Sequence, residues 1–268
     1  FSDKGGLVDN EDFVGSAFEN GIYCFAAADG LGSHNGGALA SKLAVSAIIS
    51  EFKKEPELSP QKARLCMDAA QELITTRRTA SPEVKDMAAS AVMLMTDGTS
   101  AVWAHVGDSR LYVFKRGKII EVTDDHTTAF ESFLKGDIEY GEIRESRGRN
   151  RLRRAVGDKV SYEPDISDLV KINSGFSFLI CTNGFWENIY ETEMEEALRF
   201  SFSSKAFRPS CRKILSDSSV NSTASASKAI RMCPPHFPQS EIEMISPFSP
   251  AYSLSCPTPA GVQMIPAA

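Results

Sequence analysis

Two closely spaced hairpin signals constrain the fold of this 268-residue chain more than any other feature of its sequence. Strand-like apolar segments flank Asp97-Gly98, and a second pair flanks Arg116-Gly117. Such short connections join antiparallel neighbours, because a parallel crossover needs about a dozen residues or more. The middle of the chain is therefore expected to form antiparallel sheet. With two further buried apolar runs, the expected strands are residues 22–28, 91–95, 99–106, 111–114, 119–122 and 176–181.

Helical patterns lie on both sides of this strand-rich region. Apolar residues recur with helical spacing after the Gly-rich loop 30–37, and a second helix is expected to begin at Ser59-Pro60, a favourable N-cap and first-turn pair. A third helix, residues 192–200, opens with a Thr192-x-x-Glu195 capping box. The pattern predicts a layered α+β fold in which helices pack outside antiparallel sheets.

Two segments depart from this regular alternation. Residues 127–165 are polar and rich in Arg, Glu and Gly, and a long irregular insert of this kind is usually a lid or a binding loop. After residue 200 the sequence is crowded with Ser, Pro and Ala and shows no clear periodicity. We therefore expect a folded domain over residues 1–200 and a poorly ordered tail over residues 201–268.

Composition excludes some partners and favours one compartment. The formal net charge of -6 argues against a nucleic-acid-binding surface, because a polyanion would be repelled on average. No apolar run is long enough to cross a bilayer, so no membrane partner is expected. The cysteines are far apart and suit small buried apolar side chains, which favours a reduced, cytoplasmic setting.

Neither the cysteines nor the histidines are spaced as metal-binding motifs. No Cys-x-x-Cys pair occurs among the six cysteines. His105 is expected to pack within a strand, and His126 falls in the loop after the hairpins. The four histidines, which do not form a metal-spaced set, are His34, His105, His126 and His236.

Three acidic clusters fall where strands are expected to begin or end. They are residues 9–12, Asp29 with Gly30, and Asp108 in a Gly-Asp-Ser-Arg string. Carboxylates at strand ends can converge on one rim of a sheet and hold hard cations such as Mg²⁺ or Mn²⁺. Each cluster alone has a simpler explanation as a turn or a solvated face, so the order of the clusters matters more than any one of them.

Taken in order, these strings resemble the PPM-type metal-dependent protein serine/threonine phosphatases, the type 2C family, and especially its bacterial branch. The resemblance runs from about Asp3 to Arg199, and the ordered series is far more specific than any single string. The matching strings are NED (10–12), ADGLGSHNGG (28–37), VGDSRLY (106–112), TDDHT (123–127), RNRLRRAVG (149–157) and CTNGFWE (181–187).

The resemblance implies an α-β-β-α sandwich of two antiparallel sheets flanked by helices, with two or three Mg²⁺ or Mn²⁺ ions in a cleft at one sheet edge. Asp29 would bridge two metals, Glu11 would bind one of them, and the Gly30 carbonyl would add a ligand. Asp12 and Asp108 match acidic positions of the metal cluster. The implied reaction is direct attack of a metal-activated water on phosphoserine or phosphothreonine, with Asp29 and Glu11 as the catalytic pair and residues 127–165 as a flap.

The chain also departs from the family pattern. Asn183 stands where the family has a metal-binding Asp, and its neutral amide oxygen is a weaker ligand. Leu7 replaces a phosphate-binding Arg, whose charge-assisted hydrogen bond is worth about 1.5–3 kcal/mol. Lys4, which could substitute for that Arg, and Arg110 are the candidate substrate-binding residues. The closing Asp-Asn motif has no match, since Asp217 is the only aspartate after Asp168.

Three functions are consistent with these observations. The first is a phosphatase acting on phosphorylated proteins, such as a cognate serine/threonine kinase or the substrates of that kinase. The second is a pseudophosphatase that binds phosphoproteins or regulates without full catalysis, which the altered positions favour. The third is a nucleotide-binding α/β domain, but the loop after Asp29 has neither the Lys-Ser/Thr of a P-loop nor a dinucleotide fingerprint.

Overall fold

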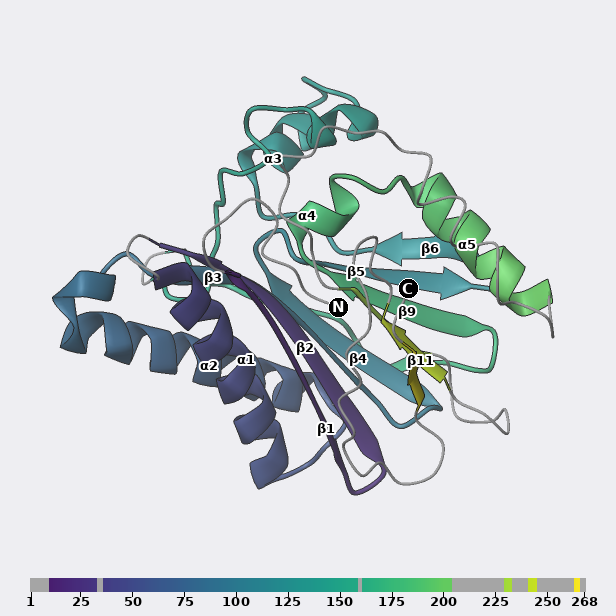
Figure 1. Ribbon diagram of the computed structural model, residues 1–268, viewed down its shortest axis with the longest axis horizontal. Coiled ribbons are helices and arrows are strands. Elements are labelled where there is room, and N and C mark those ends of the chain that lie inside the picture. Colours follow the sequence, from purple (N-terminus) through teal and green to yellow (C-terminus); the bar gives the residue numbers. More distant parts are fainter. Residues whose placement is uncertain are drawn as a thin grey trace.

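The computed structural model describes residues 10–32, 36–158 and 161–203, together with three short strands further along the chain. Its first sheet is antiparallel, with strand order β1-β2-β3-β4-β7, and β8 also pairs with β4. The long strands of this sheet lie side by side in Figure 1. The strands are β1 (Asp12–Glu19), β2 (Ile22–Leu31), β3 (Ala88–Thr96), β4 (Ser100–Val106), β7 (Asp165–Ile166) and β8 (Val170–Lys171).

The second sheet has strand order β12-β11-β10-β9-β5-β6. All its pairings are antiparallel except that of β11 with β12. The chain crosses from the first sheet to the second between β4 and β5, so residues 107–109 lie at the boundary between the sheets. The strands are β5 (Arg110–Lys115), β6 (Lys118–Val122), β9 (Phe176–Cys181), β10 (Ala229–Met232), β11 (Glu241–Met244) and β12 (Gln263–Ile265).

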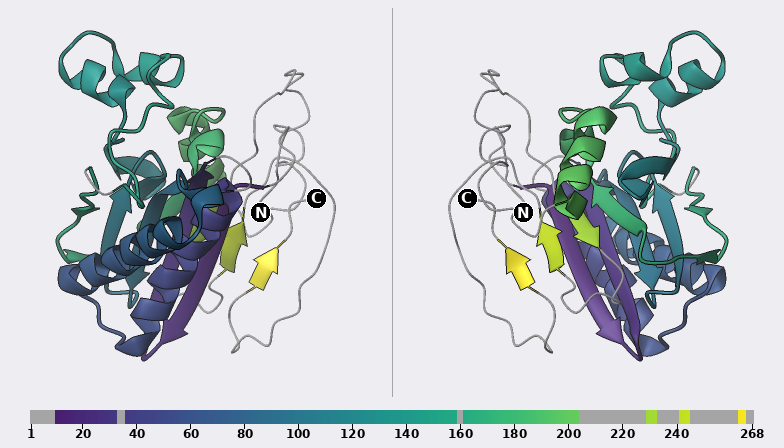
Figure 2. Two further views of the ribbon diagram at one scale, coloured as in Figure 1. Left: turned by 90° about the vertical axis from the view of Figure 1, so that its left-hand side faces the viewer. Right: turned by 90° about the vertical axis from the view of Figure 1, so that its right-hand side faces the viewer.

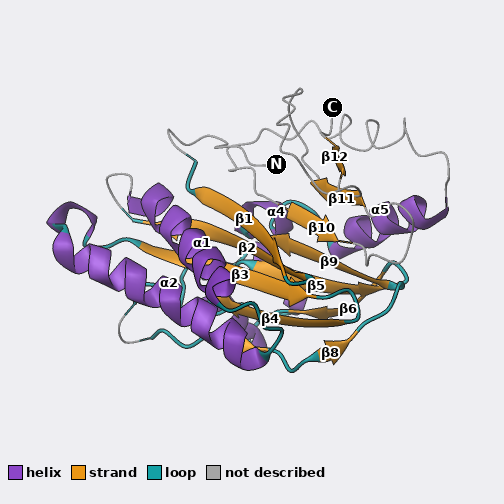
Figure 3. Ribbon diagram, turned by 90° about the horizontal axis from the view of Figure 1, so that it is seen from below, coloured by secondary structure: helices purple, strands orange, loops and turns teal. Residues whose placement is uncertain are grey.

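Helices cover the outer faces of both sheets, as Figures 1 and 3 show. The long helices α1 (Gly36–Lys54) and α2 (Pro60–Ala80) pack on the first sheet, and α4 (Asn183–Trp186) and α5 (Glu191–Ser203) lie on the second. This arrangement confirms the expected α+β sandwich. Among the described residues, no helix combines the length and the apolar character that crossing a bilayer requires.

Strand β2 shows how the sequence builds these layers. Cys24, Ala26 and Ala28 pack toward α1 and α2, whereas Phe25 and Ala27 pack between the two sheets. Successive side chains of a strand point to opposite faces, so a strand buried on both faces is apolar throughout rather than alternating. A third apolar cluster lies between the second sheet and α4 and α5. The three clusters together define four layers.

The structure confirms several element boundaries that local sequence signals predict and contradicts one. Both hairpins form at the expected turns, and the hydroxyl of Ser59 accepts a hydrogen bond from the backbone N–H of Lys62, 3.1 Å away, at the start of α2. The predicted capping box at Thr192 is wrong, because α5 begins one residue earlier, at Glu191. The Glu195 carboxylate instead accepts from the backbone N–H of Ile119 at 3.0 Å. A tertiary contact with β6 thus takes the group that the local motif would have used.

Regular elements also occur after residue 200, where the sequence shows no clear periodicity. Helix α5 runs to Ser203, and β10, β11 and β12 extend the second sheet, with Ala229 opposite Cys181. The open edge of β9 presents unpaired backbone groups, and pairing with them can order a strand of three or four residues that has no periodicity of its own. The rest of the predicted tail lies outside the described residues.

The polar insert is partly regular. It contains the short helix α3 (Thr128–Leu134) and the 3-10 helix η2 (Tyr140–Arg144), which share a small apolar cluster of Ala129, Phe130 and Ile143. Figure 2 shows this teal segment projecting from one end of the sandwich. That it acts as a lid or binding loop stays a prediction.

Replacing the N-cap, Ser59→Ala, should lower the free energy of unfolding by about 1 kcal/mol, because it removes the acceptor for a backbone N–H at the start of α2. Urea unfolding followed by circular dichroism measures the change. The matched control is Ser50→Ala, an exposed serine inside α1, which should change the stability by less than about 0.5 kcal/mol. Equal effects of the two substitutions would contradict a capping role for Ser59.

Candidate active site

Asp12 and Asp29 face each other across the β1–β2 pair. They are directly opposite in the register, so their side chains share one face of the sheet. Asp29 has the same strand parity as Phe25 and Ala27, which places its carboxyl on the face between the sheets. The hydroxyl of Thr182, at the end of β9, donates to Asp12 Oδ2 at 3.1 Å. Carboxylates from one sheet therefore meet the strand ends of the other.

Glu11 and the Gly30 carbonyl approach the same point at the start of α1. A Cβ atom on Gly37 would lie 2.5 Å from Glu11 Oε1 and 2.8 Å from the Gly30 carbonyl oxygen. Only glycine at this position leaves room for both oxygens. The Gly30 N–H also donates to the Glu11 carbonyl at 3.0 Å. Two of the predicted metal-binding groups are thus held beside each other by backbone geometry.

The pKa of Asp29 reflects how closely these acidic side chains converge. Burial raises the pKa of Asp29 well above its usual range, and the neighbouring charges of Asp12, Asp108, Glu11 and Glu187 raise it further. In the described part of the chain, no basic side chain forms an ion pair with Asp29. Crowded carboxylates of this kind are stable as anions only when a cation is close.

Asp108 lies on the crossing between β4 and β5 and is only 3% exposed. Burial, and to a lesser degree the charge of Asp125, raises the pKa of Asp108 to about 7, while a hydrogen bond from Ser90 opposes this rise. The indole Nε1 of Trp186 donates to the Asp108 carbonyl oxygen at 2.8 Å. The backbone of Asp108 is therefore held in place, and the negative charge of its buried carboxylate is what a nearby cation would have to neutralise.

Asn183 begins α4 and is partly exposed, at the end of β9 where the sequence predicts a weakened metal ligand. One residue that sequence analysis missed, Glu187, follows it by one helical turn, and its N–H donates to the Asn183 carbonyl at 2.8 Å. The charge of Glu187 raises the pKa of both Asp29 and Asp108. The i,i+4 spacing from Asn183 is the signal that could have identified it.

The donor set fits a hard divalent cation. The groups are carboxylate and carbonyl oxygens, which Mg²⁺ and Mn²⁺ prefer, and soft sulfur ligands do not contribute. Glu187 Oε1 is buried without a hydrogen-bond partner among the described residues, although Arg149 Nε lies 3.2 Å away as an ion pair. The structure brings together Glu11, Asp12, Asp29 and Asp108 of the predicted site. Lys4 and Leu7 lie outside the described residues.

The sequence model of the family described as protein phosphatase 2C matches residues 6–220. The chain belongs to the protein phosphatase 2C family. It is 26% identical over 205 residues to the serine/threonine phosphatase stp of Listeria monocytogenes serovar 1/2a, an alignment that covers 74% of this chain and 81% of the relative. The family assignment confirms the resemblance seen in the sequence, and the matched region extends past residue 200.

Solved structures share the fold. The Mycobacterium tuberculosis serine/threonine phosphatase PstP/Ppp superposes with a TM-score of 0.65 at 25% identity, covering 74% of this chain and 82% of that chain. Stp1 from Staphylococcus aureus gives a TM-score of 0.67 at 25% identity, covering 74% and 80%. A structure of the PstP catalytic domain in complex with two manganese ions gives a TM-score of 0.61 at 23% identity, covering 75% and 88%.

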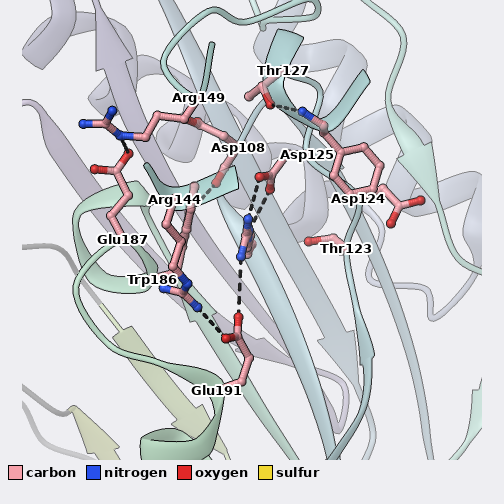
Figure 4. A network of polar contacts seen from close by, with 12 residues as sticks. Asp108, Thr123, Asp124, Asp125, Thr127, Arg144, Arg149, Trp186, Glu187 and Glu191 are labelled. Carbon is pink, nitrogen blue, oxygen red and sulfur yellow. Dashed lines mark hydrogen bonds and ion pairs between the residues drawn. The ribbon is translucent and has the colours of Figure 1, made fainter. Parts of the chain in front are cut away.

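The burial of Arg110 argues against its predicted role in substrate binding. Its side chain is 3% exposed, and its Nε and Nη2 donate to the two carboxylate oxygens of Asp125 at 2.7 and 2.6 Å. The guanidinium also lies 3.5 Å from the centre of the Trp186 ring. Figure 4 shows this network around Asp125, Trp186 and Glu191. The Gly-Asp-Ser-Arg string places Arg110 two residues after Asp108 of the candidate site, but strand alternation turns the Arg110 side chain into the interior.

The histidines meet in space although their sequence spacing suggests otherwise. His105, His126 and Asp165 each offer a ligand atom, and these atoms lie within 4.8 Å of one another. His105 packs in β4 as predicted, and the pairing of β4 with β7 places Asp165 opposite it. The structure thus brings together two histidines whose sequence spacing is not that of a metal-binding motif. A pairing between residues sixty apart in the chain leaves no local signal.

Mn²⁺ affinity should rise with pH through about 7, because a proton on Asp108 competes with a metal ion. In the metal-free protein the raised pKa of Asp108 implies that stability falls as pH rises from about 4 to about 7, since the fold disfavours the ionised form. The increase in Tm caused by Mn²⁺ should accordingly be larger at pH 8 than at pH 6. Calorimetric titrations at both pH values measure affinity and proton release, and an affinity that does not change between them would contradict the prediction.

Asp125→Asn should lower the free energy of unfolding by about 3–5 kcal/mol, because it removes the closest counter-charge of the buried Arg110 guanidinium. Chemical denaturation measures this loss. Glu131→Gln is the matched control, since the Arg153–Glu131 pair is exposed and should contribute at most about 1 kcal/mol. A loss for Asp125→Asn no larger than that of the control would show that the buried pair is not needed.

Proposed function

We propose that this chain hydrolyses phosphoserine and phosphothreonine in proteins, and that Glu11, Asp29 and Asp108 hold the Mg²⁺ or Mn²⁺ ions of the reaction. The observation that carries the proposal is the convergence of buried carboxylates on Asp29, whose pKa each neighbour raises. Asp12, the Gly30 carbonyl and Asn183 complete the proposed ligand set. Membership of the protein phosphatase 2C family supports the reaction class.

Bound Mg²⁺ or Mn²⁺ ions lower the pKa of a water molecule and neutralise the charge of a phosphate group. The protein's part is to keep anionic oxygens close together until a cation arrives, and the antiparallel pair of β1 and β2 does this by holding Asp12 and Asp29 opposite each other. Asn183 contributes a neutral oxygen, so one cation should bind less tightly than it would to a carboxylate. Lys4 is the proposed phosphate-binding cation in place of Leu7, and the segment 127–165 is the proposed flap beside the cleft.

The proposed substrates are phosphorylated proteins, including a cognate serine/threonine kinase or the substrates of that kinase. We place the reaction in the cytoplasm. Support comes from Cys24, Cys66 and Cys181, which are buried free thiols. Burial raises the pKa of each thiol, so they suit structural roles under reducing conditions rather than catalysis.

We also propose that residues 1–200 hold the catalytic groups and that residues 201–268 are a separate tail. All the acids of the proposed site precede residue 200. The three short strands of the tail add to the edge of the second sheet and bring no acidic residue that the proposed ligand set requires.

Asp29→Asn should reduce kcat/KM for a phosphothreonine peptide at least about 100-fold, because it removes the charge around which the acids gather. The assay contains about 2 mM Mn²⁺, which is on the order of the dissociation constant of a weak divalent-cation site. Asn183→Asp should instead lower the Mn²⁺ concentration needed for half-maximal rate. Glu83→Gln, in the short 3-10 helix after α2, is the control and should match the wild type. If the wild type shows no Mn²⁺-dependent turnover while it still binds a phosphopeptide, the pseudophosphatase alternative holds instead.

A further inference from the structure

One residue outside the acidic cluster holds the peptide that precedes Asp108. The N–H of Gly107 donates to His126 Nδ1 at 3.1 Å, and the N–H of His126 donates to the Gly107 carbonyl at 2.9 Å. Gly107 has φ +98°, and a Cβ atom there would lie 2.4 Å from Ser90 Cβ. The turn is therefore restricted to glycine, and both of its backbone hydrogen-bonding groups are taken by His126.

The ring of His126 is itself oriented by other residues. Because Nδ1 accepts a hydrogen bond, the neutral ring carries its proton on Nε2, which lies 3.0 Å from Asp165 Oδ2. Arg154 Nη1 donates to the other oxygen of Asp165 at 2.8 Å. The ring of His105 stacks on His126 with a centroid distance of 4.6 Å. A carboxylate thus fixes the tautomer that leaves Nδ1 free to accept from Gly107.

We propose that His126 is a positioning residue for the metal ligand Asp108, and that Asp165 and Arg154 fix its ring for this purpose. The inference rests on the proposed function, because the role of Asp108 as a ligand is part of it. The hydrogen bond from the Gly107 N–H to His126 Nδ1 persists around neutral pH. Burial, with the charges of His105 and Arg154, lowers the pKa of His126 to about 4, so Nδ1 stays an acceptor.

The same cluster has the composition of a transition-metal site, but its hydrogen bonds oppose that use. A metal ion on Nε2 of His126 would require the proton to move to Nδ1, where it would face the Gly107 N–H. Arg154 Nη1 also lies 3.3 Å from Nε2, and its charge would repel a cation. The geometry therefore favours orientation of the Gly107 peptide over metal binding by the histidines.

The decisive comparison is between His126→Phe and His126→Asn. Phenylalanine keeps the ring stack and removes the acceptor, whereas asparagine places an amide oxygen close to the position of Nδ1. Hydrogen exchange of the Gly107 amide, followed by NMR on the metal-free protein, reports the contact without reference to catalysis. Calorimetric titration with Mn²⁺ reports its effect on metal affinity.

His126→Phe should speed exchange of the Gly107 amide at least tenfold and weaken Mn²⁺ binding by about tenfold, the usual effect of losing a group that orients a ligand. In His126→Asn, the exchange rate of the Gly107 amide and the Mn²⁺ affinity should both stay within about threefold of the wild type. The kcat at saturating Mn²⁺ should change little in either variant. Glu131→Gln, in the neighbouring α3, should leave exchange and affinity unchanged.

Asp165→Ala provides a second test if His126→Phe does not fold, since the Asp165 side chain is about half exposed. It should raise the exchange rate of the Gly107 amide and shift the ¹⁵N resonances of the His126 ring toward a mixture of tautomers. Unchanged exchange and Mn²⁺ affinity in His126→Phe, or in Asp165→Ala if the first variant is unfolded, would overturn the inference. So would tight Zn²⁺ binding that both substitutions abolish.

The wild-type control separates the two proposals. A wild type that binds Mn²⁺ and hydrolyses a phosphopeptide while His126→Phe matches it in exchange and affinity would overturn the positioning role and leave the proposed function standing. A wild type that binds no Mn²⁺ would overturn the proposed function, and the positioning role of His126 with it.

Discussion

Repulsion among buried carboxylates is the constraint on which the rest of this structure depends. Asp12 and Asp29 sit directly opposite each other in the β1–β2 register, a placement that like charges disfavour. Asp108 joins them from the crossing between the sheets, almost fully buried. A fold can maintain such an arrangement only if its apolar layers are stable enough to hold it. The three packed clusters between the layers supply that stability.

A second system of charged residues, most of them buried, links the insert 127–165 with α5. Arg110 lies between Asp125 and Glu191, with Nη1 3.8 Å from Glu191 Oε1. Arg144, at the end of η2, forms an ion pair of 2.5 Å with the same Glu191. Arg149 reaches Glu187 from the same insert, and Glu187 acts electrostatically on Asp29. Two groups of ion pairs therefore connect the insert with neighbouring elements, one through Arg144 and Glu191 and one through Arg149 and Glu187 (Figure 4).

Local signals predicted the elements well where the local contact is also the final one. The two hairpin turns and the Ser59 N-cap involve residues that lie close together in the chain, and each forms as expected. Thr192 and Glu195 have an equally good local motif, yet Glu195 binds the backbone of β6. The short strands after residue 200 were missed because a strand added to an open edge takes its hydrogen bonds from β9 rather than from its own pattern.

The sequence by itself determined which residues carry charge at strand ends, in what order, and hence the family and the class of cation that the site would take. Only the tertiary structure decided which charged groups gather around Asp29 and which are buried in ion pairs. Arg110 points into the interior because strand alternation and the position of Asp125 place it there. His126 reaches Gly107, and Asp165 reaches His126, across nineteen and thirty-nine residues of chain. Contacts at such separations depend on how the sheets pack, and packing leaves no periodic trace in the sequence.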